Sequence, residues 1–362
     1  MQLRNRQRSA ILGFSLWAMA WTWGFSAAAS GQDPLVIGPL RVFSGQSVSG
    51  FLEVPAGKDV GSSIPVTVIR GAKEGKTLAL VAGIHGYEYP PVLALYRLKE
   101  MIDPQKLSGT LILVHIANLP SFQKRTIYYN PYDWKNLNRV FPGDPQGTLS
   151  QRTAFVLTEE VVKRCDGLID MHCGDGNEAL IPYTYWMKTG RTEMDELTKT
   201  MAVAFGIPHI IIDETRSKDL ADSKYLGNTA VLLGTPAITT ESGYLGRTDE
   251  ESIRRNLEGI LNVMRLFQMI GGVPMETAPP VWIDRYEVIY SQTDGLFYPL
   301  TKMGYYVVKG QKVGRITDFL GDVKEEVRAP FSGIVLYIIN TPPTSRGEPL
   351  FEVGRVLEDN PK

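Results

Sequence analysis

The sequence predicts an α/β fold in which a mostly parallel, partly mixed sheet is flanked by helices and followed by an all-β barrel-sandwich domain. Between residues 77 and 269, apolar segments of strand length alternate with segments of helical spacing, which is typical of sheets covered by helices on both faces. Residues 281–357 instead show short strand-like segments broken by Gly and Pro. A stretch rich in Gly and Pro at 271–280 separates the two regions. We therefore expect an α/β domain at 30–275 and a β domain at 281–357.

The elements of the α/β region follow from its apolar pattern. Strands are expected where five to eight apolar residues end in Gly, Pro or polar residues, and helices where apolar residues recur every three or four positions. Ser150 is expected to cap one of these helices. In chain order the prediction is short strands over 34–70, strand 77–83, helix 91–102, strand 110–117, an aromatic loop 118–149, helix 150–164, strand 167–172, helix 192–205, strand 208–213, helix 222–233, strand 236–241 and helix 249–269.

The composition is that of an ordinary globular protein. The 362 residues are 43% hydrophobic and 21% charged, which disfavours a disordered chain. Lys and Arg total 38 against 39 Asp and Glu, so no strong positive field favours nucleic acid as a partner. Cys165 and Cys173 are separated by a segment of strand character, which rises about 3.3 Å per residue and keeps the sulfurs out of bonding range. Both are expected to be free, buried thiols.

The first 29 residues have the features of a secretory signal peptide. Three Arg within the first eight residues precede an apolar segment at 10–25, which leads to three Ala at 27–29. We expect cleavage near Ala29 and export to the periplasm or beyond. The alternative is an uncleaved membrane anchor, since residues 10–29 are about long enough to span a bilayer. No later segment is apolar enough to cross a membrane, so we expect no stable membrane insertion after cleavage.

The clearest chemical signal combines two strand ends. Residues 83–88 read Gly-Ile-His-Gly-Tyr-Glu after one predicted strand, and Asp-Met-His at 170–172 ends another. Taken singly, His85 is a plausible loop histidine and His172 a plausible core histidine. Together with Glu88, they make the two-His, one-Glu set of a catalytic zinc site, whose fourth position is left to water. The sequence therefore predicts one Zn²⁺ held by these three residues.

A carboxylate and three polar side chains complete the candidate site. Glu241 follows a third strand, where a carboxylate can take a proton from water and pass it to a leaving nitrogen. In the aromatic loop, Arg139 offers a planar fork for a carboxylate and Asn138 an additional hydrogen bond. Arg125 in the same loop can stabilise an oxyanion. Taken singly, Glu241 is also consistent with an exposed loop acid, and the two arginines with surface salt bridges.

Five motifs in one order resemble the succinylglutamate desuccinylase/aspartoacylase family of zinc carboxypeptidase-like hydrolases. The resemblance spans roughly residues 35–355 and is nearest to the N-acetyl-diaminobutyrate deacetylase-like members. The motifs are Gly-Ile-His-Gly-Tyr-Glu at 83–88, Asn-Leu-Pro-Ser-Phe at 118–122, Asn-Arg-Val-Phe-Pro-Gly at 138–143, Asp-Met-His at 170–172 and Thr-Glu-Ser-Gly at 240–243.

The resemblance implies a zinc carboxypeptidase-like fold and a role for each candidate residue. It implies zinc on His85, Glu88 and His172, with Glu241 as general base and acid. It further implies that Arg125 polarises the scissile carbonyl, and that Asn138 and Arg139 hold the substrate carboxylate.

Two positions depart from the family pattern. Many relatives have Asp where this chain has Asn136, which can accept the same hydrogen bond from a zinc histidine but lacks the charge that raises ligand basicity, so weaker metal binding is expected. Cys173 stands next to His172 where relatives often have a small residue, and it is not expected to be a ligand.

The C-terminal region resembles a biotinyl/lipoyl-type sandwich. Its expected hairpin tip reads Leu-Gly-Asp at 320–322, without the Lys that a cofactor carrier presents, so we expect a structural domain. Two other signals are set aside. The phosphate-loop-like stretch at 71–77 has only three residues between its glycines and precedes its strand. His115 and His209 lie in apolar segments and are expected in the core, with His115 the nearer of the two to the site.

The predicted function is a zinc-dependent amide hydrolase that removes the acyl group from an N-acyl amino acid or a similar small carboxylate. The alternative is an exported zinc peptidase that acts on short or cell-wall peptides, and a non-catalytic binding protein is a third reading. Substrate choice is expected to lie in the loops at 119–148, 174–190 and 215–227. Asp175 and Glu178 can contact a cationic substrate there, although acidic loop residues are more often only solvated.

Overall fold

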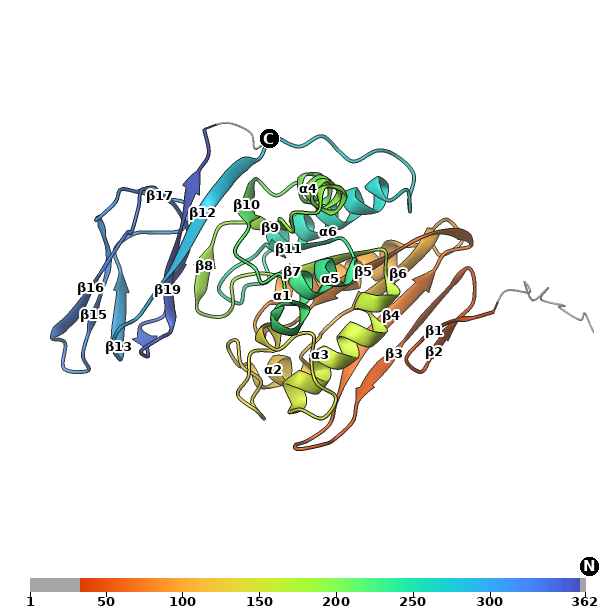
Figure 1. The fold of residues 1–362 in the computed structure, drawn as a ribbon, viewed down its shortest axis with the longest axis horizontal. Coiled ribbons are helices and arrows are strands. Elements are labelled where there is room, and N and C mark those ends of the chain that lie inside the picture. Colours follow the sequence, from red (N-terminus) through yellow and green to blue (C-terminus); the bar gives the residue numbers. More distant parts are fainter. Residues whose placement is uncertain (1–32, 359–362) are drawn as a thin grey trace, which may run out of the picture. The chain divides into compact units, whose positions relative to one another are not determined.

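The strands β5 (Lys73–Ala82), β7 (Gly167–His172) and β11 (Ala237–Glu241) form the parallel centre of the fold in the computed structural model (Figure 1). The structure describes residues 33–358, so the predicted signal peptide lies outside the described residues. Within 33–358, no helix combines the length and the apolar character needed to cross a bilayer. Parallel strands present their carboxyl ends at one edge of the sheet, and this edge carries the candidate site.

The full sheet is mixed. Among the described residues it contains thirteen strands, twelve of them in the order β14-β17-β19-β12-β10-β9-β11-β7-β5-β6-β4-β3, with β8 paired to β17. Strand β9 runs antiparallel to β11 but parallel to β10, so the direction of the sheet reverses at this point. The remaining strands of this sheet are β3 (Gln46–Val54), β4 (Ser62–Arg70), β6 (Ser108–Val114), β8 (Glu178–Leu180), β9 (Tyr183–Met187), β10 (His209–Asp213), β12 (Val281–Tyr290), β14 (Tyr306–Val307), β17 (Gly333–Ile339) and β19 (Pro349–Val356).

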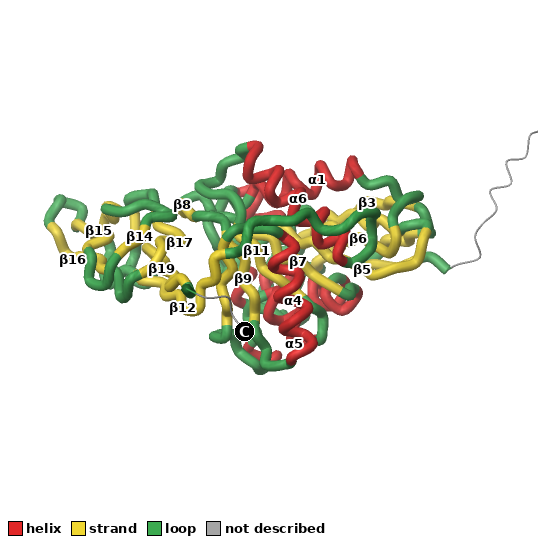
Figure 2. Tube along the Cα trace, turned by 90° about the horizontal axis from the view of Figure 1, so that it is seen from above, coloured by secondary structure: helices red, strands yellow, loops and turns green. Residues whose placement is uncertain are grey.

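Helices cover both faces of the parallel centre because its strands alternate apolar side chains between the two faces. Leu78 and Leu80 pack with α1 (Tyr89–Met101), α4 (Thr192–Phe205) and α6 (Glu250–Leu266), and α1 lies beside α6 in Figure 2. Ala79 and Val81 pack with α3 (Leu149–Glu160) and α5 (Leu226–Leu233) on the other face. The prediction of a sheet between helical layers is therefore confirmed.

The C-terminal residues are all strand and turn, as predicted. Strand β12 pairs in parallel with β10, and β19 and β17 extend the sheet beyond it, so the C-terminal strands share a sheet with the α/β region. A separate four-stranded sheet contains β13 (Gly295–Pro299), β15 (Lys312–Thr317), β16 (Val323–Arg328) and β18 (Pro343–Thr344). The hairpin β1 (Leu35–Ile37) and β2 (Leu40–Val42) stands at the other end of the described chain. The proposed domain boundary at 275–281 stays a prediction.

Several local predictions were wrong. The cap of α3 is Thr148, not Ser150, which lies inside the helix and donates from its hydroxyl to Asp133. The helix predicted over 222–233 begins only at Leu226. Strands β8 and β9 were not predicted, and α2 (Leu119–Lys124) lies within the predicted aromatic loop. The two cysteines are free, as predicted, but Cys165 is only half-buried.

Candidate metal centre

The loop after β5 carries two of the predicted metal ligands. It turns sharply because Gly83 has a φ of +68°, which favours glycine. At Gly86, a Cβ atom would lie 2.3 Å from the carbonyl oxygen of Thr126, so only glycine allows this close approach to the following loop. The turn holds His85 and Glu88 at the carboxyl end of the parallel strands, next to the end of β7.

The structure brings His85, Glu88 and His172 together. The Oε1 atom of Glu88 lies 2.8 Å from Nδ1 of His85 and 3.1 Å from Nδ1 of His172. The ligand atoms of the three residues all lie within 4.8 Å of one another, and all three side chains are buried. Both imidazoles thus present Nδ1 to the same carboxylate, which places three donor atoms within reach of one ion.

The outer nitrogen of each imidazole is held by another residue. His85 Nε2 lies 3.1 Å from Oδ1 of Asn136, and His172 Nε2 lies 2.9 Å from Oδ1 of Asp170. A proton on Nε2 leaves the lone pair of Nδ1 free, so these neighbours orient both imidazoles as metal ligands. Asn136 occupies the position at which the resemblance to the family leads us to expect Asp.

The electrostatics of the cluster suit a cation. Burial raises the pKa of Glu88, but His172 and His85 outweigh this effect and lower it to about 2, so the carboxyl is ionised. Burial lowers the pKa of His85, but Glu88 raises it above its ordinary value. Among the described residues, Oε2 of Glu88 is buried and lies 3.0 Å from Nδ1 of His172 without a well-directed hydrogen bond. Two imidazoles and a carboxylate are a donor set that fits a zinc ion.

Glu241 lies beside the cluster without belonging to it. It ends β11 in register with His172 on β7, so the two side chains point to the same face of the sheet. The side chain is half-buried. Burial raises the pKa of Glu241 well above its usual range, aided by the charges of nearby carboxylates and opposed by His172. A carboxyl group next to a metal set is in position to accept and return a proton.

Asn138 is buried and its amide is already engaged. Its Oδ1 accepts a hydrogen bond of 2.8 Å from the backbone N–H of Leu226, and its Nδ2 lies 3.0 Å from Nε2 of His172 and 3.5 Å from Asp170. In this arrangement Asn138 lies against a predicted metal ligand, and its amide N–H donates to Asp170. Its predicted contact with a substrate carboxylate stays a prediction.

The two predicted arginines lie outside the cluster. Arg139 is exposed, donates to the carbonyl of Asn138 at 2.8 Å, and places its guanidinium 4.6 Å from the ring centre of Tyr225. Arg125 is exposed at the end of α2, with a φ of +53°. Neither side chain forms a hydrogen bond with the three clustered residues in the described part of the chain, so their roles stay predictions.

The structure also shows residues near the site that the sequence analysis missed. Tyr128 donates from its hydroxyl to Glu178 at 2.8 Å, and its ring stands edge-on to His85 at 6.0 Å. Tyr183 on β9 is in register with Glu241 and bonds through its hydroxyl to Glu352 on β19. The sequence signal for Glu352 was a single acid inside an apolar strand. His115 stacks on Tyr96 and bonds to Thr67, so it is a core residue, as predicted.

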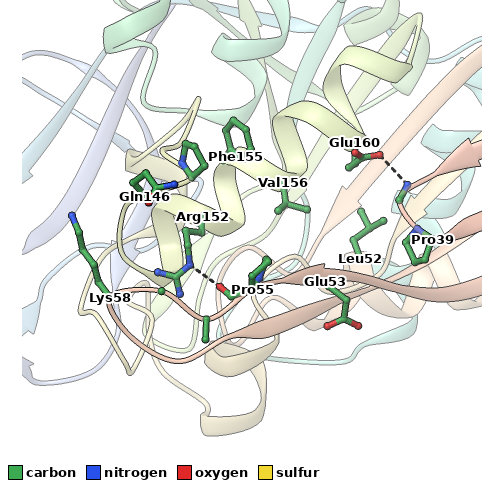
Figure 3. A pocket seen from close by; sticks show the side chains of 14 residues that line it. Pro39, Leu52, Glu53, Pro55, Lys58, Gln146, Arg152, Phe155, Val156 and Glu160 are labelled. Atoms are coloured by element: carbon green, nitrogen blue, oxygen red, sulfur yellow. Dashed lines mark hydrogen bonds between the residues drawn. The ribbon is translucent and has the colours of Figure 1, made fainter.

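A cavity of about 1030 Å³ lies elsewhere, between β3 and α3 (Figure 3). Two of its polar groups are engaged by the protein: Arg152 donates to the carbonyl of Pro55, and Glu160 accepts from the backbone N–H of Gly38. None of the predicted site residues lines it. The clustered residues at the carboxyl ends of the strands are therefore the better candidate for chemistry.

Comparison with known proteins identifies relatives of this chain. Residues 74–267 match the model of the succinylglutamate desuccinylase/aspartoacylase catalytic domain. The chain is 29% identical over 343 residues to the N-alpha-acetyl-L-2,4-diaminobutyric acid deacetylase of Halomonas elongata, covering 90% of this chain and 97% of that protein.

Solved structures show the same fold. A succinylglutamate desuccinylase from a Silicibacter species has 25% identity and a TM-score of 0.77, covering 89% of this chain and 100% of that chain. A succinylglutamate desuccinylase/aspartoacylase from Rhodobacter sphaeroides has 27% identity and a TM-score of 0.75, covering 86% of this chain and 96% of that chain. The matched residues 74–267 contain all seven predicted site residues. The chain therefore belongs to the succinylglutamate desuccinylase/aspartoacylase family of deacylating hydrolases.

Proposed function

We propose that this protein is a zinc-dependent deacylase that hydrolyses the amide bond of a small N-acyl amino acid. The observation that carries the proposal is the buried cluster of His85, Glu88 and His172, with Glu241 in register beside it. The Halomonas relative, named for the removal of an acetyl group from 2,4-diaminobutyric acid, supports an N-acyl amino acid as the substrate class.

The three clustered residues would hold the metal. When bound, zinc lowers the pKa of water to about 7 and polarises a carbonyl. Asn136 and Asp170 keep both imidazoles turned with Nδ1 inward. These contacts hold the imidazoles in place before the metal binds, so the ligand geometry does not have to form during binding.

Glu241 moves the protons of the reaction. Its carboxylate accepts a proton from the attacking water and donates it to the amide nitrogen as the carbon–nitrogen bond breaks. The place of Glu241 beside the cluster, in register with His172, supports both steps, because a proton carrier must lie within reach of the attacking water and the leaving nitrogen. Arg125 is proposed to stabilise the charge that develops on the carbonyl oxygen, and Arg139 to bind the substrate carboxylate.

The proposal is tested by metal content and a substrate panel. The purified protein is expected to bind about one zinc per chain, to lose activity in a chelator and to regain it with added zinc. It should cleave N-acetyl amino acids faster than dipeptides, and the reverse preference would favour the peptidase alternative. A chain that binds zinc but cleaves neither class would contradict a hydrolase.

The variant Glu241→Gln distinguishes a role in proton transfer from a role in metal binding. The variant is expected to lose about 100- to 10,000-fold in kcat with zinc still bound. Glu100→Gln, at an exposed position of α1, is the matched control and should keep full activity. Retained turnover in Glu241→Gln would remove Glu241 from this role.

We also propose that residues 1–29 are a signal peptide and that the mature protein works outside the cytoplasm. Expression of the full chain with fractionation and mass determination of the product tests this. A mature mass that begins near Ser30 is expected, and an intact N-terminus in the membrane fraction would indicate an anchor instead.

A further inference from the structure

Strand β3 is a long open edge of the large sheet (Figure 1). Its nine residues stand last in the strand order and pair with β4 in one continuous register without a bulge. In the described part of the chain, the backbone of residues 47–54 finds hydrogen-bonding partners on β4 alone. Every second residue of β3 therefore presents its N–H and C=O away from the sheet, where another strand can pair with them.

The other open edges of the described sheets are short or charged. Strands β14 and β18 have two residues each. Strand β16 has six residues, four of them charged, and its pairing with β15 is irregular. Proteins protect exposed edges by these means, and also with Lys or Pro. Strand β3 has neither Lys nor Pro, and Glu53 is its only charge, so nothing in its sequence prevents pairing with a further strand.

The hairpin β1–β2 covers one face of β3 and does not pair with its edge. The hairpin forms a separate sheet, and its Leu40 packs with Leu52 of β3 in the same buried cluster. A Cβ atom at Gly50 would lie 2.6 Å from the Leu40 side chain. Gly50 and Leu52 share one face of the strand, so the hairpin lies over that face. Phe51 points to the opposite face and is 50% exposed.

The residues of β3 suit pairing with a second copy of the same strand. Antiparallel pairing about a two-fold axis at Gly50 sets Leu52 of one copy opposite Val48 of the other, which extends the apolar face. The same pairing sets Glu53 opposite Ser47, so like charges do not meet. A two-fold contact uses the same surface on both copies and is complete with two chains.

The cavity between β3 and α3 gives the second copy a further contact. Leu52, Glu53 and Pro55 line it at the end of β3 (Figure 3). Phe43 lies at the start of β3, where its carbonyl accepts from the N–H of Gln46, and its side chain is 44% exposed. Because the paired strands run in opposite directions, the two-fold axis brings the Phe43 turn of each copy beside the cavity of the other.

The surface has the size that a stable dimer needs. Specific dimers bury about 800 Å² per partner, contributed by about 20 to 30 residues a side. The nine residues of β3 and the 14 residues that line the cavity, two of which are shared, form a surface of this extent. The strands and loops of this surface also expose four large apolar side chains, those of Val36, Phe43, Phe51 and Val60.

We propose that β3 is a dimerisation surface, through which two copies of this chain pair about a two-fold axis near Gly50 and join their sheets into one. The Phe43 turn of each copy covers the cavity of the other. The proposal is independent of the proposed deacylase activity, because none of the predicted site residues lies on β3.

Light scattering during size-exclusion chromatography, together with sedimentation, tests the association. The purified chain is expected to be a dimer at micromolar concentrations. Phe51→Lys, which places a charge on the edge strand, should raise the dissociation constant at least about tenfold. Val323→Lys, at an exposed position of the β16 edge, is the matched control and should stay dimeric. A monomeric wild type, or a dimer that Phe51→Lys leaves unchanged, would overturn the proposal.

Exchanging charges at Ser47 and Glu53 tests the pairing about Gly50. Ser47→Glu sets like charges opposite each other twice in the dimer, so the dissociation constant should rise about 2- to 30-fold. Adding Glu53→Lys to this variant should restore the dimer, because opposite charges then face each other. A general disturbance of the strand would not be rescued in this way. Absence of rescue would overturn pairing about Gly50.

A disulfide trap gives an independent measurement. In the double variant Ser49→Cys/Phe51→Cys, each new thiol lies opposite a new thiol of the second copy, at the separation of cross-strand neighbours. Mild oxidation should link the chains in a non-reducing gel. The wild type, with Cys165 and Cys173 alone, is the control and should stay unlinked. Absence of linked chains in the variant would contradict the proposal, and cleavage of N-acyl amino acids by the same protein would still support the deacylase.

Discussion

The Nε2 atom of His85 lies 3.1 Å from Oδ1 of Asn136, so a neutral amide holds a histidine that also contacts Glu88. The same Asn136 oxygen accepts the backbone N–H of Asn138 at 2.8 Å, which ties the imidazole to the loop of the predicted substrate residues. An amide orients an imidazole as a carboxylate does, but it adds no negative charge to the ligand.

The affinity of the site for zinc should depend on the residue at position 136. Asn136→Ala is expected to weaken zinc binding by about 10- to 100-fold, because the imidazole loses its orienting partner. Asn136→Asp should strengthen it, because a carboxylate raises the basicity of the ligand. Competition with a chromogenic chelator measures both, and Asn340→Ala, at an exposed position, is the control. Unchanged affinity in both variants would show that the contact does not tune the metal.

The turn that holds His85 and Glu88 should not tolerate a larger residue at Gly86. Gly86→Ala places a Cβ atom 2.3 Å from the carbonyl oxygen of Thr126, and the turn must move. We expect a loss of about 1–3 kcal/mol in the free energy of unfolding, together with weaker zinc binding. Gly271→Ala, where a Cβ meets nothing within 4 Å, is the control in urea unfolding. A fully stable Gly86→Ala protein with normal zinc affinity would contradict the close packing.

Arg139 should act on substrate binding more than on the chemical step. Arg139→Lys keeps the charge but loses the planar fork and the stacking over Tyr225. We expect KM for an N-acetyl amino acid to rise about tenfold, with kcat changed less than about threefold. Arg254→Lys on the exposed face of α6 is the control. A fall in kcat at constant KM would instead assign Arg139 to the reaction itself.

Glu352 should make the stability of the folded chain depend on pH. Its pKa is raised from 4.5 to about 8 by burial, so between these values the folded chain holds a proton that the unfolded chain releases. The contribution of this protonated carboxyl to the free energy of unfolding is fully present below pH 4.5 and is lost as the pH rises through 8. The free energy of unfolding falls by at most about 1.4 kcal/mol per pH unit in this range.

Glu352→Gln cannot ionise and should remove this dependence. In urea unfolding of the zinc-free protein, its stability relative to the wild type should rise by about 2–3 kcal/mol between pH 5.5 and 7.5. Glu287→Gln, at a partly exposed acid paired with Arg285, is the control and should show no such change. Parallel pH curves for the wild type and Glu352→Gln would mean that the carboxyl is not buried in its neutral form.

The sequence alone determined those helices, strands and turns that depend on residues close together in the chain. Short apolar runs defined the central strands, and the glycines around His85 marked a turn that only small residues permit. Because catalytic groups of such sheets follow the carboxyl ends of strands, the motifs at 83–88 and 170–172 could be placed next to each other before the fold was known. The fold class was predicted from the same local pattern, whereas the family was predicted from the resemblance of five ordered motifs.

Only the tertiary structure decided the strand order and the partners that depend on it. The reversal of direction at β9, the helix cap at Thr148 and the engagement of Asn138 by Leu226 depend on packing between segments that the sequence pattern leaves independent. Glu352 lies 169 residues beyond Tyr183 and meets it only because β19, β12, β10 and β9 follow one another in the sheet. Local periodicity records which side of a strand is buried, whereas the identity of the neighbouring strand is set by the packing of the whole chain.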